Sequence, residues 1–322
     1  MQVVSPDLIR GKKVLVRLDI DVPVENGKVG EILRLEAGIP TLEMCLQNAE
    51  FVTAMGHIGR PGGKEVPQLS VEPIYDWLAQ RLGEDHFQTG KLKLLENLRF
   101  EPGEEAADLN YTKELASYGD FYINEAFASH HPAASTTVLP TLLPHAAGLH
   151  FAKEVETLAR VRENPGRPFV AIIGGVKVED KLPAVLAMAK IADEVLVGGK
   201  IAGELRGRTD LPGNVVLAVI NDAGTDLTEE TAQAWLPKIA QAKMVLWNGP
   251  LGRVEDPQND KSRKIAQAIA SCQGETILGG GDSIAYVNSL GLLGKFGFVS
   301  TGGGAMLKFL IDGTLPAVEA LK

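Results

Sequence analysis

Two glycine-rich segments, GGGDS at 279–283 and STGGG at 300–304, each lie between an apolar run and a helical pattern. A glycine-rich loop that leads into a helix exposes backbone N–H groups at the positive end of the helix dipole, where phosphate binds well. One such loop is as compatible with a tight turn as with a phosphate site. Two of them, with Asp282 available to hold Mg²⁺, favour a phosphate-binding site. The chain contains neither a GxxxxGK(S/T) nor a GxGxxG motif, so the common P-loop and the dinucleotide fingerprint are excluded.

The segment GGVKVEDK at 174–181 places two lysines, Lys177 and Lys181, four residues apart. They share one face if a helix begins there. Adjacent like charges repel, which is unusual for a structural pair but suits the binding of a phosphoryl group. Taken alone, each lysine is more simply explained as a solvated surface residue.

Cationic side chains gather in the first half of the chain, at the ends of expected strands and the starts of expected helices. They are Arg17, Arg34, His57, Arg60, Arg99 and His131. The guanidinium fork binds phosphate and carboxylate oxygens through two parallel hydrogen bonds. A single arginine is usually solvated or paired with an acid, but several at the loops of one sheet predict an anion site. Asp19 and Asp21 beside them either bind a substrate hydroxyl or balance the positive charge.

The elements that position these residues alternate between short apolar runs and helical stretches. Strands are expected at 13–18, 51–56, 92–96, 120–124, 169–174, 194–198, 214–220, 244–249, 276–280 and 296–301, with helical periodicity at 34–48, 72–83 and 110–118. This alternation predicts parallel sheets with helices on both faces. Ligands of such sheets bind at the carboxyl ends of the strands, where the unusual residues stand. We therefore expect an α/β fold of two Rossmann-like lobes.

The length of 322 residues exceeds the usual size of a single core, so two domains are expected. The stretch 148–164 favours a helix, ended by Asn164, Pro165 and Gly166. We interpret it as a hinge helix between a lobe at 1–147 and a lobe that begins at 148. A single helix inside one large sheet is the alternative.

Composition excludes several classes of protein. A net charge of −9 argues against nucleic-acid binding, and no apolar run reaches the roughly 18 residues of a membrane span. The N-terminal residues MQVVSPDLIRGKK lack the layout of a signal peptide. Cys45 and Cys272 lie far apart in apolar surroundings. We expect a cytoplasmic protein with two buried, unpaired thiols.

These segments, in this order, resemble phosphoglycerate kinases. The resemblance runs through VLVRLDIDVP, GHIGRP, LLENLRF, FYINEAF, IIGGVKVEDK, VLVGGK, WNGPLGRVE, ILGGGDS and STGGGA, and so covers nearly the whole chain. It implies reversible phosphoryl transfer between 1,3-bisphosphoglycerate and ADP, giving 3-phosphoglycerate and ATP, in line and after domain closure. It further implies a triose-binding lobe at 1–147, a nucleotide-binding lobe at 148–302, a segment at 303–322 that returns to the first lobe, Mg²⁺ as cofactor, and a monomer.

The resemblance also implies roles for single residues. The triose substrate would be bound by Asp19, Asp21, Arg34, His57, Arg60, Arg99 and His131. Arg34 and Lys181 would meet the charge on the moving phosphoryl group, with Lys177, Gly280 and Gly281 completing the catalytic set. The nucleotide would be bound by Gly175, Lys177, Lys181, Gly198, Gly199, Asn248, Pro250, Glu255 at the ribose, Gly281, Asp282 and Ser283, with Asp282 as the metal ligand.

Three residues depart from the family pattern. Asp21 stands where the family has Asn, Pro132 where it has a substrate-binding Arg, and Lys200 at the third glycine of a GGG run. The chain is also shorter than typical members, above all between Lys200 and Trp247, where the family has an apolar wall of the adenine pocket. Two alternatives therefore stay open: a pseudoenzyme that binds nucleotide, and a kinase of another small carboxylate.

Overall fold

The computed structural model describes residues 1–253, 256 and 260–322, and the chain divides into two compact units. Unit 1 comprises Met1–Glu156 together with Thr314–Lys322, and unit 2 comprises Thr157–Gly313. The first boundary lies inside helix α7 (Leu149–Glu163), which corresponds to the helix expected at 148–164. The second boundary lies later than expected, because residues 303–313 stay with unit 2 and only the last residues belong to unit 1.

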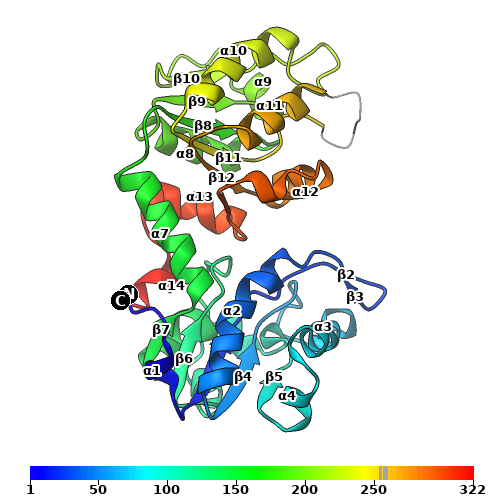
Figure 1. The fold of residues 1–322 in the computed structure, drawn as a ribbon, viewed down its shortest axis with the longest axis vertical. Helices are drawn as coiled ribbons and strands as arrows, with labels where there is room; N and C mark the ends of the chain where they lie inside the picture. Colours follow the sequence, from blue (N-terminus) through cyan, green and yellow to red (C-terminus); the bar gives the residue numbers. More distant parts are fainter. Residues whose placement is uncertain (254–255, 257–259) are drawn as a thin grey trace. The chain divides into compact units, whose positions relative to one another are not determined.

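Unit 1 is built on a five-stranded parallel sheet in the order β5-β4-β1-β6-β7 (Figure 1). Its strands are β1 (Lys13–Arg17), β4 (Phe51–Met55), β5 (Leu92–Leu94), β6 (Phe121–Asn124) and β7 (His145–Ala147). In the centre, Val16 of β1 pairs with Ala54 and Ile123, and all three side chains are buried. The apolar runs of the sequence therefore form strands buried on both faces, as parallel sheets require.

The helices of unit 1 cover this sheet. They are α1 (Pro6–Ile9), α2 (Leu33–Asn48), α3 (Glu72–Leu82), α4 (Asp85–Gln88), α5 (Pro102–Glu105), α6 (Leu109–Ala116) and α14 (Pro316–Glu319). A short hairpin, β2 (Val24–Glu25) and β3 (Lys28–Val29), follows β1. The expected helices at 34–48, 72–83 and 110–118 are confirmed as α2, α3 and α6, whereas the hairpin and β7 were not expected.

Unit 2 contains a six-stranded parallel sheet in the order β10-β9-β8-β11-β12-β13. The strands are β8 (Phe169–Ile173), β9 (Glu194–Val197), β10 (Val215–Leu217), β11 (Met244–Asn248), β12 (Glu275–Gly279) and β13 (Phe298–Val299). The helices are α8 (Val178–Ala189), α9 (Gly199–Glu204), α10 (Glu229–Gln241), α11 (Asp260–Ala270), α12 (Gly281–Ser289) and α13 (Gly303–Asp312). The predicted fold class, two parallel sheets flanked by helices, is confirmed.

Two further expectations concern surface and core. Among the described residues, no helix is long and apolar enough to cross a membrane. Both cysteines are free, and Cys45 is buried in the core of unit 1. The expectation of two buried thiols was wrong for Cys272, which is only half-buried because it follows the last turn of α11 at the end of the helix.

Candidate active site

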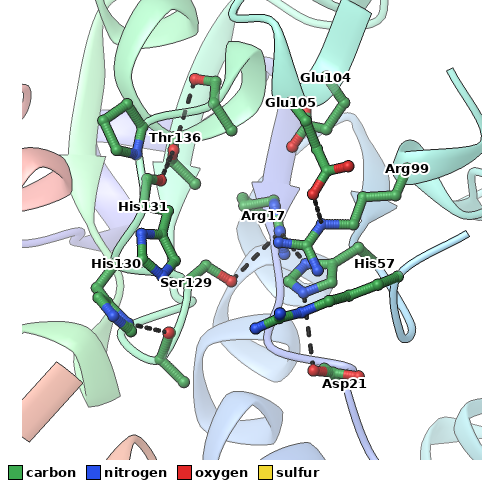
Figure 2. A pocket seen from close by; sticks show the side chains of 14 residues that line it. Arg17, Asp21, His57, Arg99, Glu104, Glu105, Ser129, His130, His131 and Thr136 are labelled. Carbon is green, nitrogen blue, oxygen red and sulfur yellow. Dashed lines mark hydrogen bonds and ion pairs between the residues drawn. The ribbon is translucent and has the colours of Figure 1, made fainter. Parts of the chain in front are cut away.

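A cavity of about 390 Å³ opens in unit 1 among the loops that follow β1, β4 and β6 (Figure 2). It is lined by Arg17, Asp21, His57, Arg60, Arg99, Glu104, Glu105, Ala128, Ser129, His130, His131, Pro132, Ala133 and Thr136. The lining includes five of the residues predicted to bind the substrate. It also includes Pro132, so two of the three departures from the family pattern, Asp21 and Pro132, lie in one cavity.

Arg17 is the buried anchor of this cavity. It is the last residue of β1 and only 1% exposed, and its guanidinium is surrounded by hydrogen-bond acceptors. Nε donates to Ser135 Oγ at 3.0 Å, Nη2 lies 2.7 Å from His57 Nδ1, and Nη1 donates to the carbonyl of Leu18. The sequence showed Arg17 as a strand-end cation, but the resemblance did not assign it to the substrate.

His57 is a neutral hydrogen-bond donor rather than a cation. A guanidinium can only donate, so His57 Nδ1 accepts from Arg17 and its single proton is on Nε2. Burial, reinforced by the charges of Arg17 and Arg99, lowers the pKa of His57 to about 2. Its Nε2 lies 3.8 Å from Asp21 Oδ2, beyond hydrogen-bond distance. The positive charge of the cavity therefore comes from arginines.

Carboxylates hold these cationic groups in place. Asp21 Oδ1 accepts a hydrogen bond from the backbone N–H of Gly59 at 2.8 Å. Arg99 donates from Nη1 to the carbonyl of Gly59 at 2.8 Å, and its Nε lies 3.3 Å from Glu105 Oε1. By contrast, Arg60 makes no hydrogen bond or ion pair with the residues that the structure describes. An incoming anion therefore meets one open arginine and several that are already positioned.

Asp19 and Arg34 were predicted to bind the substrate but do not line this cavity. Arg34, near the start of α2, donates from Nη1 to the backbone carbonyl of Asp21 at 2.6 Å. It lines a neighbouring cavity of about 440 Å³ that shares Asp21 with the first one. Asp19 is buried, with Oδ2 3.8 Å from Arg34 Nε, and burial raises its pKa against the opposing charges of Arg34 and Arg17. Arg34 is therefore linked to the cavity by its hydrogen bond to Asp21, and Asp19 lies behind Arg34; neither residue forms the cavity wall.

The opposite wall is formed by the loop after β6. The rings of His130 and His131 lie with centroids 4.3 Å apart, and His130 Nδ1 is 3.0 Å from the carbonyl of Ala128 (Figure 2). His131 was predicted, whereas His130, Ser129 and Thr136 were missed. Their only signal was their place in the loop after a buried strand, which many polar residues share.

In unit 2, the predicted glycines lie where backbone segments touch. A Cβ added to Gly199 would lie 2.7 Å from the carbonyl oxygen of Gly175, and one added to Gly303 would lie 2.5 Å from Gly280 Cα. Both distances are too short for a side chain, so packing alone requires glycine there. Gly281 differs, because a Cβ there would meet nothing within 4 Å. At the first residue of α12, this open space is accessible to a ligand.

Lys181 is the positioned lysine of the predicted pair. Its Nζ donates to Asn248 Oδ1 at 2.7 Å, and Asn248 Nδ2 donates to the carbonyl of Gly303 at 3.4 Å. Burial lowers the pKa of Lys181, opposed by the charges of Asp180 and Asp282. Lys177 is exposed and precedes the first residue of α8. The structure therefore connects Lys181, but not Lys177, to the glycine loop at the start of α13.

The first turn of α12 offers the predicted phosphate and metal ligands. Asp282 is exposed, and the buried Oγ atoms of Ser283 and Ser300 make no hydrogen bond with the described part of the chain. The first N–H groups of a helix also lack helical partners. Pro250 follows Gly249 after β11, with its carbonyl oxygen only 2.2 Å from where a Cβ on Gly174 would lie. The predicted ribose ligand, Glu255, lies outside the described residues.

The family profile described as Phosphoglycerate kinase matches residues 7–207 and 214–313. The phosphoglycerate kinase of Moorella thermoacetica is 35% identical, with 97% of each chain covered. That of Thermus thermophilus is also 35% identical and covered to 97%. These alignments run over 380 and 381 positions, more than the 322 residues of this chain, so the relatives carry segments that this chain lacks. The solved structure of phosphoglycerate kinase from Coxiella burnetii superposes with a TM-score of 0.85 at 28% identity, covering 97% of this chain and 96% of the other.

Proposed function

The chain belongs to the phosphoglycerate kinase family, and from that premise we propose how its two units divide the reaction. The activity is reversible phosphoryl transfer between 1,3-bisphosphoglycerate and ADP, a step of glycolysis that gives 3-phosphoglycerate and ATP. In this proposal unit 1 binds the triose and unit 2 binds the nucleotide. The relatives named above are phosphoglycerate kinases, which does not favour a pseudoenzyme or another acceptor.

The triose binds in the cavity of unit 1. The observation that carries this assignment is the convergence of Arg17, Arg60 and Arg99 on one cavity together with neutral His57. Arg60, open to the cavity, binds the phosphate of 3-phosphoglycerate directly. Arg99 contributes after its contact with Glu105 loosens, because a phosphate competes for the same guanidinium. Asp21, which lines the cavity, accepts a hydrogen bond from the substrate hydroxyl, and His131, with Asp19 and Arg34 beside the cavity, completes the binding set.

The nucleotide phosphates bind at the glycine loops of unit 2. The first-turn N–H groups of α12 and the hydroxyl of Ser283 serve as donors to phosphate oxygens. Lys181, held by Asn248, faces the phosphoryl group that moves, and exposed Lys177 binds the more distant phosphates. The backbone around Gly175, Gly198, Gly199 and Pro250 forms the adenosine side, with Glu255 at the ribose.

We assign Mg²⁺ to Asp282. The ion prefers oxygen ligands and commonly uses one or two carboxylates plus substrate phosphates, which a single exposed carboxylate beside a phosphate site fits. When bound, Mg²⁺ neutralises phosphate charge. Asp282→Asn should therefore abolish the gain in nucleotide affinity that Mg²⁺ gives, as measured by calorimetry with and without the ion.

Phosphoryl transfer requires the protein mainly to position the two ligands and to stabilise the developing charge. The phosphoryl group moves in line between two oxygens, and Arg34 and Lys181 are proposed to meet its developing charge. No side chain needs to act as a covalent nucleophile. Because the two ligands bind to different units, closure around the hinge helix α7 must bring them together and exclude water. We further propose a monomer in a reducing compartment such as the cytoplasm, which the two free thiols fit.

The experiment is a coupled assay with ATP, Mg²⁺ and 3-phosphoglycerate. We expect turnover in the native chain and its loss in Arg34→Ala. The control is Arg10→Ala, because Arg10 is exposed and its side chain pairs, within the described part of the chain, with Asp7 alone. Equal rates for the native chain and Arg34→Ala would refute the proposed role of Arg34. Activity on unphosphorylated glycerate equal to that on 3-phosphoglycerate would refute the assignment of the arginines to the phosphate.

A further inference from the structure

A group of titratable side chains surrounds the first turn of α7. It comprises Asp19, Glu125 and Glu154, which are buried, and His150, which is half-buried, and all four belong to unit 1. Asp19 is the only one to which the proposed function gives a role. Buried ionisable groups cost free energy unless they are paired, so three buried carboxylates beside one imidazole call for an explanation.

His150 is fixed from two sides. Its backbone N–H donates to Glu125 Oε1 at 3.0 Å, next to a second bond from the N–H of Phe151 to Glu125 Oε2 at 2.9 Å. Thr41 donates its hydroxyl to the same carboxylate at 2.6 Å. The imidazole Nε2 lies 3.2 Å from Glu154 Oε1, one turn further along the helix. The half-buried ring therefore has a defined place beside the first turn of α7.

His150 and Asp19 line the same small cavity. The cavity has a volume of about 10 Å³, and its polar lining consists of Asp19, Arg34, Glu125 and His150. A space of this size holds one water molecule at most. Among the described residues Asp19 Oδ2 makes no hydrogen bond, and Arg34 Nε lies 3.8 Å away. Arg34 and His150 are thus the two lining residues that can carry a positive charge.

Electrostatics agree with this arrangement. Burial by itself lowers the pKa of His150, but the hydrogen bond and charge of Glu154, with the charges of Glu125 and Asp19, outweigh it and raise the pKa. Burial raises the pKa of Asp19, while the positive charges of Arg34, Arg17 and His150 lower it. The charged groups that face this pair are Arg17 from β1, Asp21, Arg34 from α2, Glu125 after β6 and Glu154 from α7.

We propose that His150 is a positioning residue for the carboxylate of Asp19: its protonated ring, held by Glu154, faces Asp19 and keeps that carboxylate charged and in place. The inference rests on the proposed role of Asp19 in substrate binding. It also gives α7 a function beyond connection, because the helix that crosses the boundary between the units carries the group that supports a substrate ligand.

The kinetic test compares His150→Gln with the native chain over a range of pH. Loss of the positive charge raises the pKa of Asp19, so the acid limb of kcat/KM for 3-phosphoglycerate should move to higher pH by about half a unit or more. The KM for 3-phosphoglycerate should rise several-fold at neutral pH, while the KM for ATP stays constant. The control is His145→Gln, since His145 lies on β7 and, among the described residues, its ring hydrogen-bonds only to the carbonyl of Leu143. An unmoved acid limb overturns the proposal.

A reciprocal measurement does not depend on activity. By linkage, Asp19→Asn should lower the pKa of His150, read by NMR on histidine-labelled protein with His150→Gln as the assignment standard. Should His150→Gln fail to fold, Glu154→Gln replaces it, because loss of this partner also lowers the pKa of His150. An unchanged His150 titration in Asp19→Asn overturns the inference. Unchanged 3-phosphoglycerate affinity of Asp19→Asn, measured by calorimetry, refutes instead the role of Asp19 in the proposed function.

Discussion

In the proposed function, the cavity of unit 1 and the glycine loops of unit 2 bind anions by different physical means. In unit 1, side chains supply the positive charge, and carboxylates such as Glu105 and Asp21 hold the cavity's cationic groups and its loops in place. In unit 2, backbone segments approach so closely that Gly174 and Gly199 have no room for a Cβ. Lys181 is the positioned cation there, and it depends on Asn248.

The two units should therefore respond differently to substitutions. Where recognition depends on charge, a substitution that keeps the shape should change affinity and pH dependence but leave the fold intact. Where it depends on backbone approach, one added methyl group should disturb the fold itself.

The largest effect is expected for Gly174→Ala in unit 2. The new Cβ would lie 2.2 Å from the carbonyl oxygen of Pro250 and 2.6 Å from that of Gly249, and neither backbone oxygen can move aside freely. We expect a loss of several kcal/mol of unfolding free energy, on the order of 3 kcal/mol or more, and loss of activity. Thermal unfolding measures it. Gly203→Ala in α9 is the matched control, because its Cβ meets nothing within 4 Å, so an equal loss in both variants would contradict the contrast.

The next largest effect is expected for kcat in Lys181→Met. This change keeps the length of the half-buried side chain but removes the charge that Asn248 holds near the glycine loops. We expect kcat to fall by about 10²–10³-fold, the usual effect of losing one preorganised group that stabilises transition-state charge. In Lys177→Met, whose lysine is exposed, the KM for ATP should change more than kcat. Comparable losses of kcat in both variants would remove the distinction between the two lysines.

Periodicity predicted most of the fold because the strands of both units are apolar on both faces. The strands that it missed are β7 and the two strands of the β2–β3 hairpin, which have only two or three residues each and so carry no periodic signal. Only part of the candidate site could be predicted in the same way. The glycine loops can be located from their place between strand and helix, but the partners of a side chain cannot.

The surroundings of Arg17 show that limit. Its Nε bonds Ser135, which in turn donates to Glu104, and these residues come from segments far apart in the sequence. Glu104 belongs to an acidic run, a pattern that predicts exposed side chains, yet it is 1% exposed. Likewise, the sequence grouped Arg34 with the other arginines, whereas its place on α2 directs it to a neighbouring cavity. Which cations converge depends on packing that local patterns do not encode.

In unit 1, Asp21→Asn should strengthen binding without harming the fold. Asn can still accept the hydrogen bond from the N–H of Gly59, but the cavity loses one negative charge that opposes an anionic substrate. We expect the KM for 3-phosphoglycerate to fall by up to about tenfold, or ~1.4 kcal/mol, with kcat little changed. Pro132→Arg, which adds a cation to the same cavity, should act in the same direction. If KM is unmoved in both variants, the triose does not bind in this cavity.

The smallest effect is on acid stability, in His57→Gln. The pKa of His57 is lowered to about 2 in the folded protein by burial and by Arg17, whereas an unfolded histidine titrates near 6.5. Below pH 6.5 the unfolded state therefore binds a proton that the folded state does not, so His57 makes no contribution above that pH and destabilises the fold increasingly below it. Relative to His57→Gln, the native chain should lose about 1 kcal/mol of unfolding free energy between pH 6.5 and pH 5.5, because the unfolded histidine is already half protonated at pH 6.5. Denaturant unfolding at pH 6.5 and pH 5.5 measures this difference, with His86→Gln as control, because His86 lies on α4 and does not line the cavity. A constant difference between native and His57→Gln proteins would mean that His57 is charged when folded, and the cavity would then hold one cation more than its geometry indicates.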